Sequence, residues 1–478
     1  MVEDEDIQEM DELASSMESK LQCYWSVGAS SVYEVNSSLI HRVQQHIHEL
    51  DRNAYEPIIL SIGPYHHGTP SLQAMEKEKW NCLDYILKLN CGKGLQDYVN
   101  AIEGLEKQAR NCYSEEINMD SERFLKMLLL DGCFILVSLC GTQGIVCPRE
   151  ELSGEVQTQN QENTYQFGQW YITFVIHDLL LLENQIPFFI VERIYELVAD
   201  KDAATSSLAE EIAEFVEGIL RYYPKAIQES NRPKDFHHLI HLCHIYFKPS
   251  QKQEEAEHQY KEWAQYFKIG RQLERSDENL LSIQKQTGQR RWRRAVQYYE
   301  AGVEFKKKEL DTYNPHSLLD IKFSNGVMEI PYLFVEENTG CLFNNLIAFE
   351  QTCPEFGNDF TSYIFFMSQL ISTPDDVTLL AQRGIIVHQL RRDAEVSSLF
   401  TKLNKDVVFD FNGKYYLKSM FSVLEAHYQS RLNRWVAWLR NNHFSNPWLA
   451  LGVLAATIVL FCTLVQTLIA VLSYVKPP

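Results

Sequence analysis

Residues 448–475 read WLALGVLAATIVLFCTLVQTLIAVLSYV and contain no charged side chain. A helix that crosses a membrane needs about 20 mainly apolar residues, so this stretch is long enough to span a bilayer. Aromatic residues stand at both of its ends, where the membrane–water interface favours them. We therefore expect a C-terminal transmembrane helix, marked by Trp448, Leu449, Gly452, Gln466, Val471 and Tyr474. A buried helix of a soluble core is the alternative.

The charges around this span predict its orientation. Arg431, Arg434 and Arg440 precede the span, whereas Lys476 alone follows it. Positive charge next to a span tends to stay on the cytoplasmic side. The acidic start MVEDEDIQEMDE lacks the basic and apolar regions of a signal peptide. These features predict a single-pass protein with a C-terminal anchor, a cytosolic large domain and a location at the plasma membrane.

Composition limits the partners of the chain. The formal net charge of −20 argues against nonspecific binding of nucleic acid, which requires a basic surface. The 11 cysteines are scattered without a CxxC motif, which is typical of free thiols in a reducing compartment. In the tail, Gly452 and Ala456 form a small-xxx-small pair, and Gln466 can hydrogen-bond to a neighbouring helix. We expect the lipid bilayer, a protein partner and a second copy bound through the tail as partners.

Hydrophobic periodicity predicts a mainly α fold with small β-hairpin elements. Apolar residues recur at helical spacing in residues 75–89, 340–351 and 363–371, and residues 124–139 are apolar nearly all round. Residues 171–198 predict two helices, because Pro187 cannot continue the first of them. Thr373 and Pro374 are typical of a helix start. Residues 55–68 predict a short buried strand or extended segment that ends at Gly63.

Three regions follow from composition. Residues 1–30 are acidic and poor in apolar anchors, which predicts disorder. Residues 31–446 are expected to form one large helical domain with polar insertions near 141–169 and 248–290. Residues 447–478 contain the transmembrane helix and a short tail.

The sequence LLDIKFSNGVMEIPYLFV, residues 318–335, predicts a β-hairpin. Asn325 and Gly326 suit a two-residue type I′ turn, because both tolerate a positive φ. This register places Phe323 opposite Met328, Ile321 opposite Ile330 and Leu319 opposite Tyr332 on one apolar face. On the other face it pairs Lys322 with Glu329. Matched apolar pairs and opposite charges both favour this register.

Polar residues in LLLLENQIPFF, residues 179–189, form the first candidate site. Glu183 can be a catalytic carboxylate with Asp178 or His177 as its partner. Alternatively, these side chains and the adjacent amides satisfy backbone groups at the helix break, since buried polar groups must be hydrogen-bonded. The structural interpretation is favoured. It is also favoured for His66 and His67, because adjacent side chains on a strand point to opposite faces.

The segment FHHLIHLCHIYF, residues 236–247, is a candidate metal site. A helix here places His237, His241 and His244 on one face, and zinc favours imidazole ligands. No HExxH motif accompanies them, and no carboxylate is evident on that face. We therefore expect a structural role for these histidines, without a metal or cofactor. No GxSxG, P-loop or GxGxxG motif is present either, and no catalytic residue is predicted.

Several segments, in this order, resemble the plant Domain of Unknown Function 247 family. They are IGPYHHG with MEKEK, DGCFILVSL, DLLLLENQIPFFIVE, EAGVEFK, LLDIKFSNGVMEIP, NLIAFEQ, DDVTLLAQRGII and RWVAWLRNNHFSNPW with the apolar tail. The resemblance covers about residues 33–478, and its wording is closest to grass members. It implies a membrane-anchored plant protein without an established enzymatic activity. Some grass members are implicated as pollen-side determinants of self-incompatibility.

Motifs and resemblance together predict a membrane-anchored recognition or signalling protein, with pollen-side self-incompatibility as one role. Two alternatives stay open. The first is a metal-dependent enzyme that uses the face of His237, His241 and His244. The second is a membrane scaffold without specific recognition.

Overall fold

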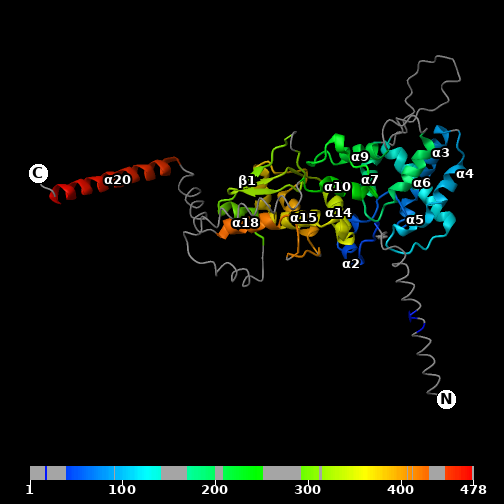
Figure 1. Ribbon diagram of the computed structural model, residues 1–478, viewed down its shortest axis with the longest axis horizontal. Coiled ribbons are helices and arrows are strands. Elements are labelled where there is room, and N and C mark those ends of the chain that lie inside the picture. Colours follow the sequence, from blue (N-terminus) through cyan, green and yellow to red (C-terminus); the bar gives the residue numbers. More distant parts are fainter. Residues whose placement is uncertain are drawn as a thin grey trace, which may run out of the picture.

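The computed structural model describes residues 39–90, 92–140, 169–199, 208–250, 292–311, 315–405, 407–411, 413–429 and 447–475, together with residues 15, 17 and 18. These residues form a mainly helical protein with five short strands, as expected (Figure 1). The disorder predicted for residues 1–30 and the insertions predicted near 141–169 and 248–290 fall almost wholly outside them. The division of the chain near residues 30 and 446 stays a prediction.

Helices make up the first half of the chain, coloured blue to green in Figure 1. Their bounds are α2 Gln45–His48, α3 Glu76–Leu89, α4 Leu95–Glu103, α5 Glu106–Asn111, α6 Ser121–Cys140, α7 Gln169–Leu179, α8 Phe188–Val198, α9 Leu208–Ile219 and α10 Leu239–Phe247. Short 3-10 turns lie at Arg52–Ala54, Pro70–Met75 and Glu229–Asn231. The predicted break at Pro187 is confirmed, since this residue is the N-cap of α8.

Helix α6 is the centre of this half. It contacts α3, α4, α8 and α9, and nearly all of its side chains from Phe124 to Leu139 are buried. This explains why its sequence is apolar on every face. Gly132 allows α8 to approach closely, because a Cβ at this position would lie 2.5 Å from the Ile194 side chain. The burial predicted for residues 124–139 is therefore confirmed.

The second half combines helices with two small sheets. Its elements are α13 Ala295–Glu300, β1 Glu304–Lys307, β2 Lys322–Ser324, β3 Val327–Ile330, β4 Leu333–Val335, α14 Thr339–Thr352, α15 Asp359–Leu370, α16 Pro374–Gln382, β5 Ile386–His388, α17 Asp393–Leu403 and α18 Lys418–Gln429, with a 3-10 turn at Pro354–Phe356. Thr373 is the N-cap of α16, as predicted, and forms a capping box with Asp376. The basic segment 431–440 lies outside the described residues.

The turn and the register of the predicted hairpin are confirmed, but its ladder is shorter than predicted. β2 begins at Lys322, so the ladder does not include the predicted pairs Ile321–Ile330 and Leu319–Tyr332. β2 and β3 are antiparallel, with Lys322 opposite Glu329 and Phe323 opposite Met328. Asn325 has φ 52° and Gly326 has φ 79°, as a type I′ turn requires. Two further pairings were not predicted, because parallel partners are distant in sequence. β1 pairs with β3, and β4 pairs with β5.

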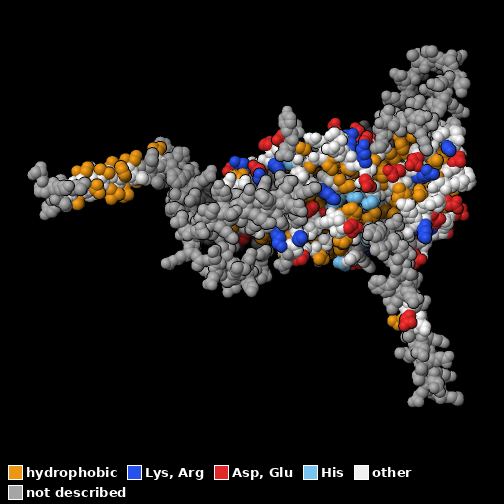
Figure 2. All heavy atoms as spheres, viewed as in Figure 1, with side chains coloured by type: hydrophobic (Ala, Val, Ile, Leu, Met, Phe, Trp, Pro, Cys, Tyr) orange, Lys and Arg blue, Asp and Glu red, His pale blue; other side chains and the backbone are white. Residues whose placement is uncertain are grey.

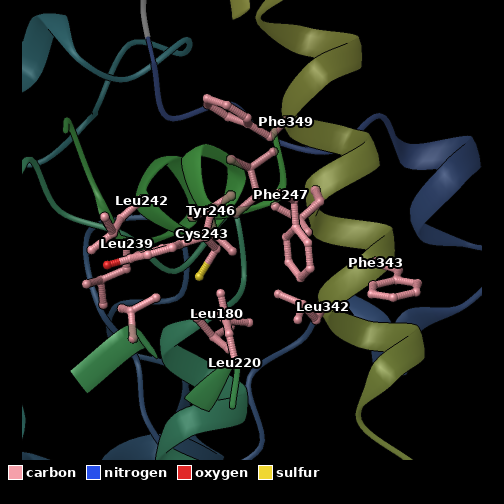
Figure 3. Close-up of a cluster of buried hydrophobic side chains, with 14 of the residues drawn as sticks. Leu180, Leu220, Leu239, Leu242, Cys243, Tyr246, Phe247, Leu342, Phe343 and Phe349 are labelled. Carbon is pink, nitrogen blue, oxygen red and sulfur yellow. The ribbon is translucent and has the colours of Figure 1, made fainter. Parts of the chain in front are cut away.

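The two halves share a hydrophobic core. Helix α10 packs against α14 and α9, and the labelled side chains in Figure 3 come from α10, from α14 and from the residues that follow α7 and α9. Tyr246 and Phe247 of α10 are buried together with Phe343 and Phe349 of α14. This continuous core fixes the position of the loop between α7 and α8 relative to the extended segment 57–63.

The prediction of a C-terminal transmembrane helix is wrong for this structure. A crossing needs an apolar helical run of about 20 residues. The chain forms α20 at Pro447–Val475, but no helix within the described residues is both long and apolar enough to cross a membrane. Among the polar groups of α20, the hydroxyls of Thr463 and Thr467 bond to carbonyl oxygens of its preceding turns. The predicted single-pass anchor and the membrane location derived from it are therefore not supported. The residues that marked this anchor are Trp448, Leu449, Gly452, Gln466, Val471 and Tyr474.

Candidate functional site

Residues 178–187, from the last turn of α7 to the N-cap of α8, hold the extended segment 57–63 in place by side-chain hydrogen bonds. Asp178 accepts bonds of 2.7–2.8 Å from the backbone N–H groups of Ile58, Ile59 and Leu60. Asp178 is fully buried, so these bonds replace the water that its carboxylate loses. Residues 57–63 form no strand, because side chains rather than a neighbouring strand satisfy their backbone.

The two amides of this segment act in the same way. Asn184 accepts a bond of 2.6 Å from the N–H of Ile62 and donates to the carbonyl of Leu60 at 2.9 Å. Gln185 donates to the carbonyls of Leu179 and Leu181 and accepts from the N–H of Leu239, the first residue of α10. The structural interpretation therefore holds for Asp178 and for both amides.

Gly63 explains why the extended segment turns at this point. Its φ is +75°, and a Cβ would lie 2.3 Å from the carbonyl oxygen of Gln185, so a side chain cannot fit. Its N–H donates to the carboxylate of Asp131 at 2.8 Å. Asp131 in turn forms a buried ion pair of 2.7 Å with Lys79 of α3. The glycine thereby brings the following residues, including His66, against Glu183.

Glu183 is the exception in this segment, because it borders a cleft. Its Oε1 accepts a bond of 2.8 Å from the N–H of Val43. Its Oε2 lies 3.5 Å from Nε2 of His66 and 3.8 Å from Nε of Arg42. The side chain is 3% exposed. The catalytic alternative gives Glu183 either Asp178 or His177 as its partner, whereas in the structure those two residues pair with each other at 2.9 Å.

Burial shifts both titratable groups of this contact toward neutrality. Burial raises the pKa of Glu183 to about 7, and the Val43 hydrogen bond and the Arg42 charge reduce that shift. Burial, followed by the charge of Arg42, lowers the pKa of His66 to about 4. Near neutral pH the imidazole is therefore uncharged beside a carboxyl group that can release or accept a proton.

We call the surrounding depression the Glu183 cleft. It has a volume of about 720 Å³, and its lining includes Glu183, His66 and the charged side chains of Arg42, Glu56 and Glu115. Arg42 and Glu115 form an ion pair of 3.3 Å and are 46% and 51% exposed. The cleft therefore combines a buried proton-exchanging carboxyl with a charged, solvent-accessible rim.

The histidine face is assembled differently from the prediction. Helix α10 begins at Leu239, so His237 lies before the helix and His238 is its N-cap. The rings of His237 and His241 stack at 4.9 Å, and Phe349 and Phe356 pack against His241. Burial lowers the pKa of His238 to about 3 and that of His241 still further. The rings of His238 and His241 are neutral packing groups of the core.

His244 meets a carboxylate that the sequence did not indicate. Its Nε2 lies 2.8 Å from Oε1 of Glu350, on α14. Glu350 also accepts bonds from the N–H groups of Phe360 and Thr361 at the start of α15, where a carboxylate complements the helix dipole. Among the described residues, no group of three or more His, Cys, Asp or Glu side chains is placed to hold a metal ion.

Fold and cleft together define a mainly helical protein whose loops are fixed by buried carboxylates and amides around an open, charged cleft. A family model described as a plant protein of unknown function, DUF247, matches residues 40–462. The chain therefore belongs to the DUF247 family, as its motifs indicated.

Two proteins of Arabidopsis thaliana are similar to it along most of their length. A UPF0481 protein is 29% identical over 449 residues, which cover 92% of this chain and 87% of the relative. A putative UPF0481 protein is 20% identical over 486 residues, which cover 88% of each chain. No solved structure shows a significant match.

Proposed function

We propose that this chain is a recognition protein that binds a partner protein at the rim of the Glu183 cleft and has no catalytic activity. One observation carries the proposal: Asp178, Asn184 and Gln185 are buried and used internally, whereas the rim is charged and exposed. Asp178, Asn184 and Gln185 are saturated by backbone groups. A catalytic role would require such groups to be available to a substrate.

The rim, in contrast, can exchange its contacts. Arg42 and Glu115 form a half-exposed ion pair, and Glu56 is 53% exposed and 3.9 Å from His48. Exposed pairs of this kind contribute little to stability, so their replacement by ion pairs with a partner costs little. Charged rims of this type give specificity and fast association in protein complexes. Figure 2 shows charged and hydrophobic side chains intermixed over the visible face.

Self-incompatibility in pollen is one role that such recognition can serve, and it is a proposal from the resemblance alone. It requires the partner to be recognised by allele. Variation among alleles concentrated in residues 141–169 and 248–290 would support it.

A second candidate function rests on the contact between Glu183 and His66. A carboxyl with a pKa near 7 beside a neutral imidazole can act in acid–base chemistry. Glu183→Gln separates the candidates, because it removes the titrating group and retains an acceptor for the Val43 N–H. Binding of a partner should survive this substitution, whereas acid–base catalysis should be lost.

The proposal is tested by affinity capture from plant tissue with the whole chain as bait. Arg42→Glu reverses the charge at the rim, and Arg123→Glu is the matched control. Arg123 lies on α6, is 67% exposed and does not line the cleft. We expect one protein to be recovered with the wild type and the control but not with Arg42→Glu. Equal recovery with all three baits, or no specific recovery, would contradict the proposal.

A further inference from the structure

A second depression, the His177 groove, lies on the other side of Glu56 and Pro57 from the Glu183 cleft. Its volume is about 990 Å³. Its lining comes from residues 51–58, from residues 336–341 and from α17. A groove of this size accommodates several side chains of a peptide.

The charges of this groove are mainly negative. Its lining includes the carboxylates of Asp51, Glu56, Glu336, Glu337 and Glu395, against the cations Arg392 and Lys402. Arg392 lies 3.4 Å from Glu395, so these two charges largely compensate each other. Within the described part of the chain, no ion pair is formed by Asp51, Glu336 or Glu337. Three carboxylates are thus available to a cationic ligand.

His177 provides a second and independent indication of a ligand. The side chain is only 7% exposed, yet it lines the groove. Its Nδ1 donates to Asp178, whose carboxylate accepts three backbone bonds and is therefore rigidly placed. The opposite edge of the ring carries Nε2, which has no hydrogen-bond partner among the described residues and is not a buried atom. Nε2 is therefore presented to the groove, in an orientation set by Asp178.

An apolar contact completes the groove. Ile58 lines it and is 48% exposed, although its N–H is held by Asp178. A large aliphatic side chain on a rigid segment is a suitable anchor for an apolar residue of a partner. Leu390 and Leu399 are two further apolar side chains in the lining of the groove.

We infer that the His177 groove binds a basic, extended segment of a partner protein, in which Lys or Arg residues alternate with apolar ones. The cations meet Asp51, Glu336 and Glu337, an apolar side chain packs on Ile58, and Nε2 of His177 bonds to a polar group of the segment. This inference rests on the proposed recognition function and adds the chemical class of the partner.

The experiment uses the full chain and a fluorescein-labelled peptide of alternating lysine and leucine, with binding measured by fluorescence anisotropy at physiological salt. We expect saturable binding. Glu336→Gln/Glu337→Gln should weaken binding about fivefold, because the two ion pairs between these carboxylates and lysines of the peptide are lost. Lys402→Glu should strengthen it, a gain that partial unfolding cannot produce. A peptide of alternating glutamate and leucine should not bind.

Glu103→Gln/Glu122→Gln is the matched control. It changes the charge by the same amount at two exposed glutamates of α4 and α6 that line neither depression. We expect unchanged affinity for this variant. Equal weakening in both double variants would show general attraction to an acidic chain and would overturn the inference. Weakening in the control alone would place the peptide outside the groove and would overturn the inference as well.

Absence of binding to the wild type would also overturn the inference. The capture experiment with Arg42→Glu then still decides the recognition function, because it depends on the other cleft. His177→Gln provides a further arm, with the melting temperature measured in parallel. An unchanged affinity in a folded His177→Gln variant would remove the histidine from the site.

Discussion

The carboxyl group of Glu183 accepts a hydrogen bond of 2.8 Å from the backbone N–H of Val43, which is 140 positions away in the chain. This bond joins the described segment 39–90 to the loop between α7 and α8. Because the same carboxyl lies 3.5 Å from His66 and has a raised pKa, its protonation is linked to folding.

The first prediction concerns pH. The folded-state pKa of Glu183 is raised from 4.5 to about 7, so the folded state holds this proton more tightly than the unfolded state. The resulting stabilisation is fully present below pH 4.5 and is lost as the pH rises through 7. A shift of this size corresponds to about 3 kcal/mol. Glu183→Gln should make stability less dependent on pH between 5 and 7, as measured by denaturant unfolding.

His66 acts with the opposite sign in nearly the same range. Its pKa is lowered from 6.5 to about 4, so its contribution is present above pH 6.5 and is lost as the pH falls through 4. The comparison of wild type with Glu183→Gln isolates the carboxyl, and His66→Gln isolates the imidazole. Parallel curves for wild type and Glu183→Gln would contradict the raised pKa.

The second prediction concerns Gly63. Gly63→Ala should destabilise the protein by about 3 kcal/mol or more, because it combines a positive φ with a Cβ placed 2.3 Å from a carbonyl oxygen. Gly68→Ala is the matched control, since Gly68 has φ +81° and no atom within 4 Å of its Cβ position. It should cost only about 1 kcal/mol. Equal losses of melting temperature would show that the contact with Gln185 is unimportant.

The third prediction concerns the turn of the hairpin. Gly326→Val should lower the melting temperature clearly, because a β-branched residue disfavours φ 79° and its Cβ would lie 3.2 Å from the ring of His427. Gly326→Asn is the conservative control, since asparagine tolerates a positive φ. Identical melting curves for the valine variant and the wild type would mean that the turn does not hold the register.

The fourth prediction concerns metal. We expect well under one equivalent of zinc in the purified protein by elemental analysis. The reason is that His241 packs against aromatic rings and that His244 forms a hydrogen bond with Glu350. His241→Ala should leave the metal content unchanged. One equivalent of zinc that this substitution removes would instead establish a metal site.

Much of the helical architecture could be predicted from the sequence. Helical periodicity located α3, α6, α14 and the pair interrupted at Pro187, and local turn chemistry located the hairpin and the start of α16. These features depend on residues that are close together in the chain. The candidate site could be predicted only in part: Glu183 was named, but its contacts with Val43, His66 and Arg42 were not predicted.

The errors have a common physical origin. Helical spacing placed His237 on one face with His241 and His244, whereas the helix begins two residues after His237. The apolar tail predicted a transmembrane helix, and the described part of the chain contains no helix that meets that requirement. The parallel pairs β1–β3 and β4–β5 left no local signal, because their registers depend on how distant segments pack.

The sequence by itself determined the helices α3, α6, α8 and α14, the turn at Asn325 and Gly326, and the family. Only the tertiary structure decided which buried groups meet: Glu183 with Val43 and His66, His177 with Asp178, and His244 with Glu350. The reason is that backbone propensity and periodicity act over a few residues. Hydrogen bonds of buried carboxylates, in contrast, are chosen when the core excludes water and every such group needs a partner.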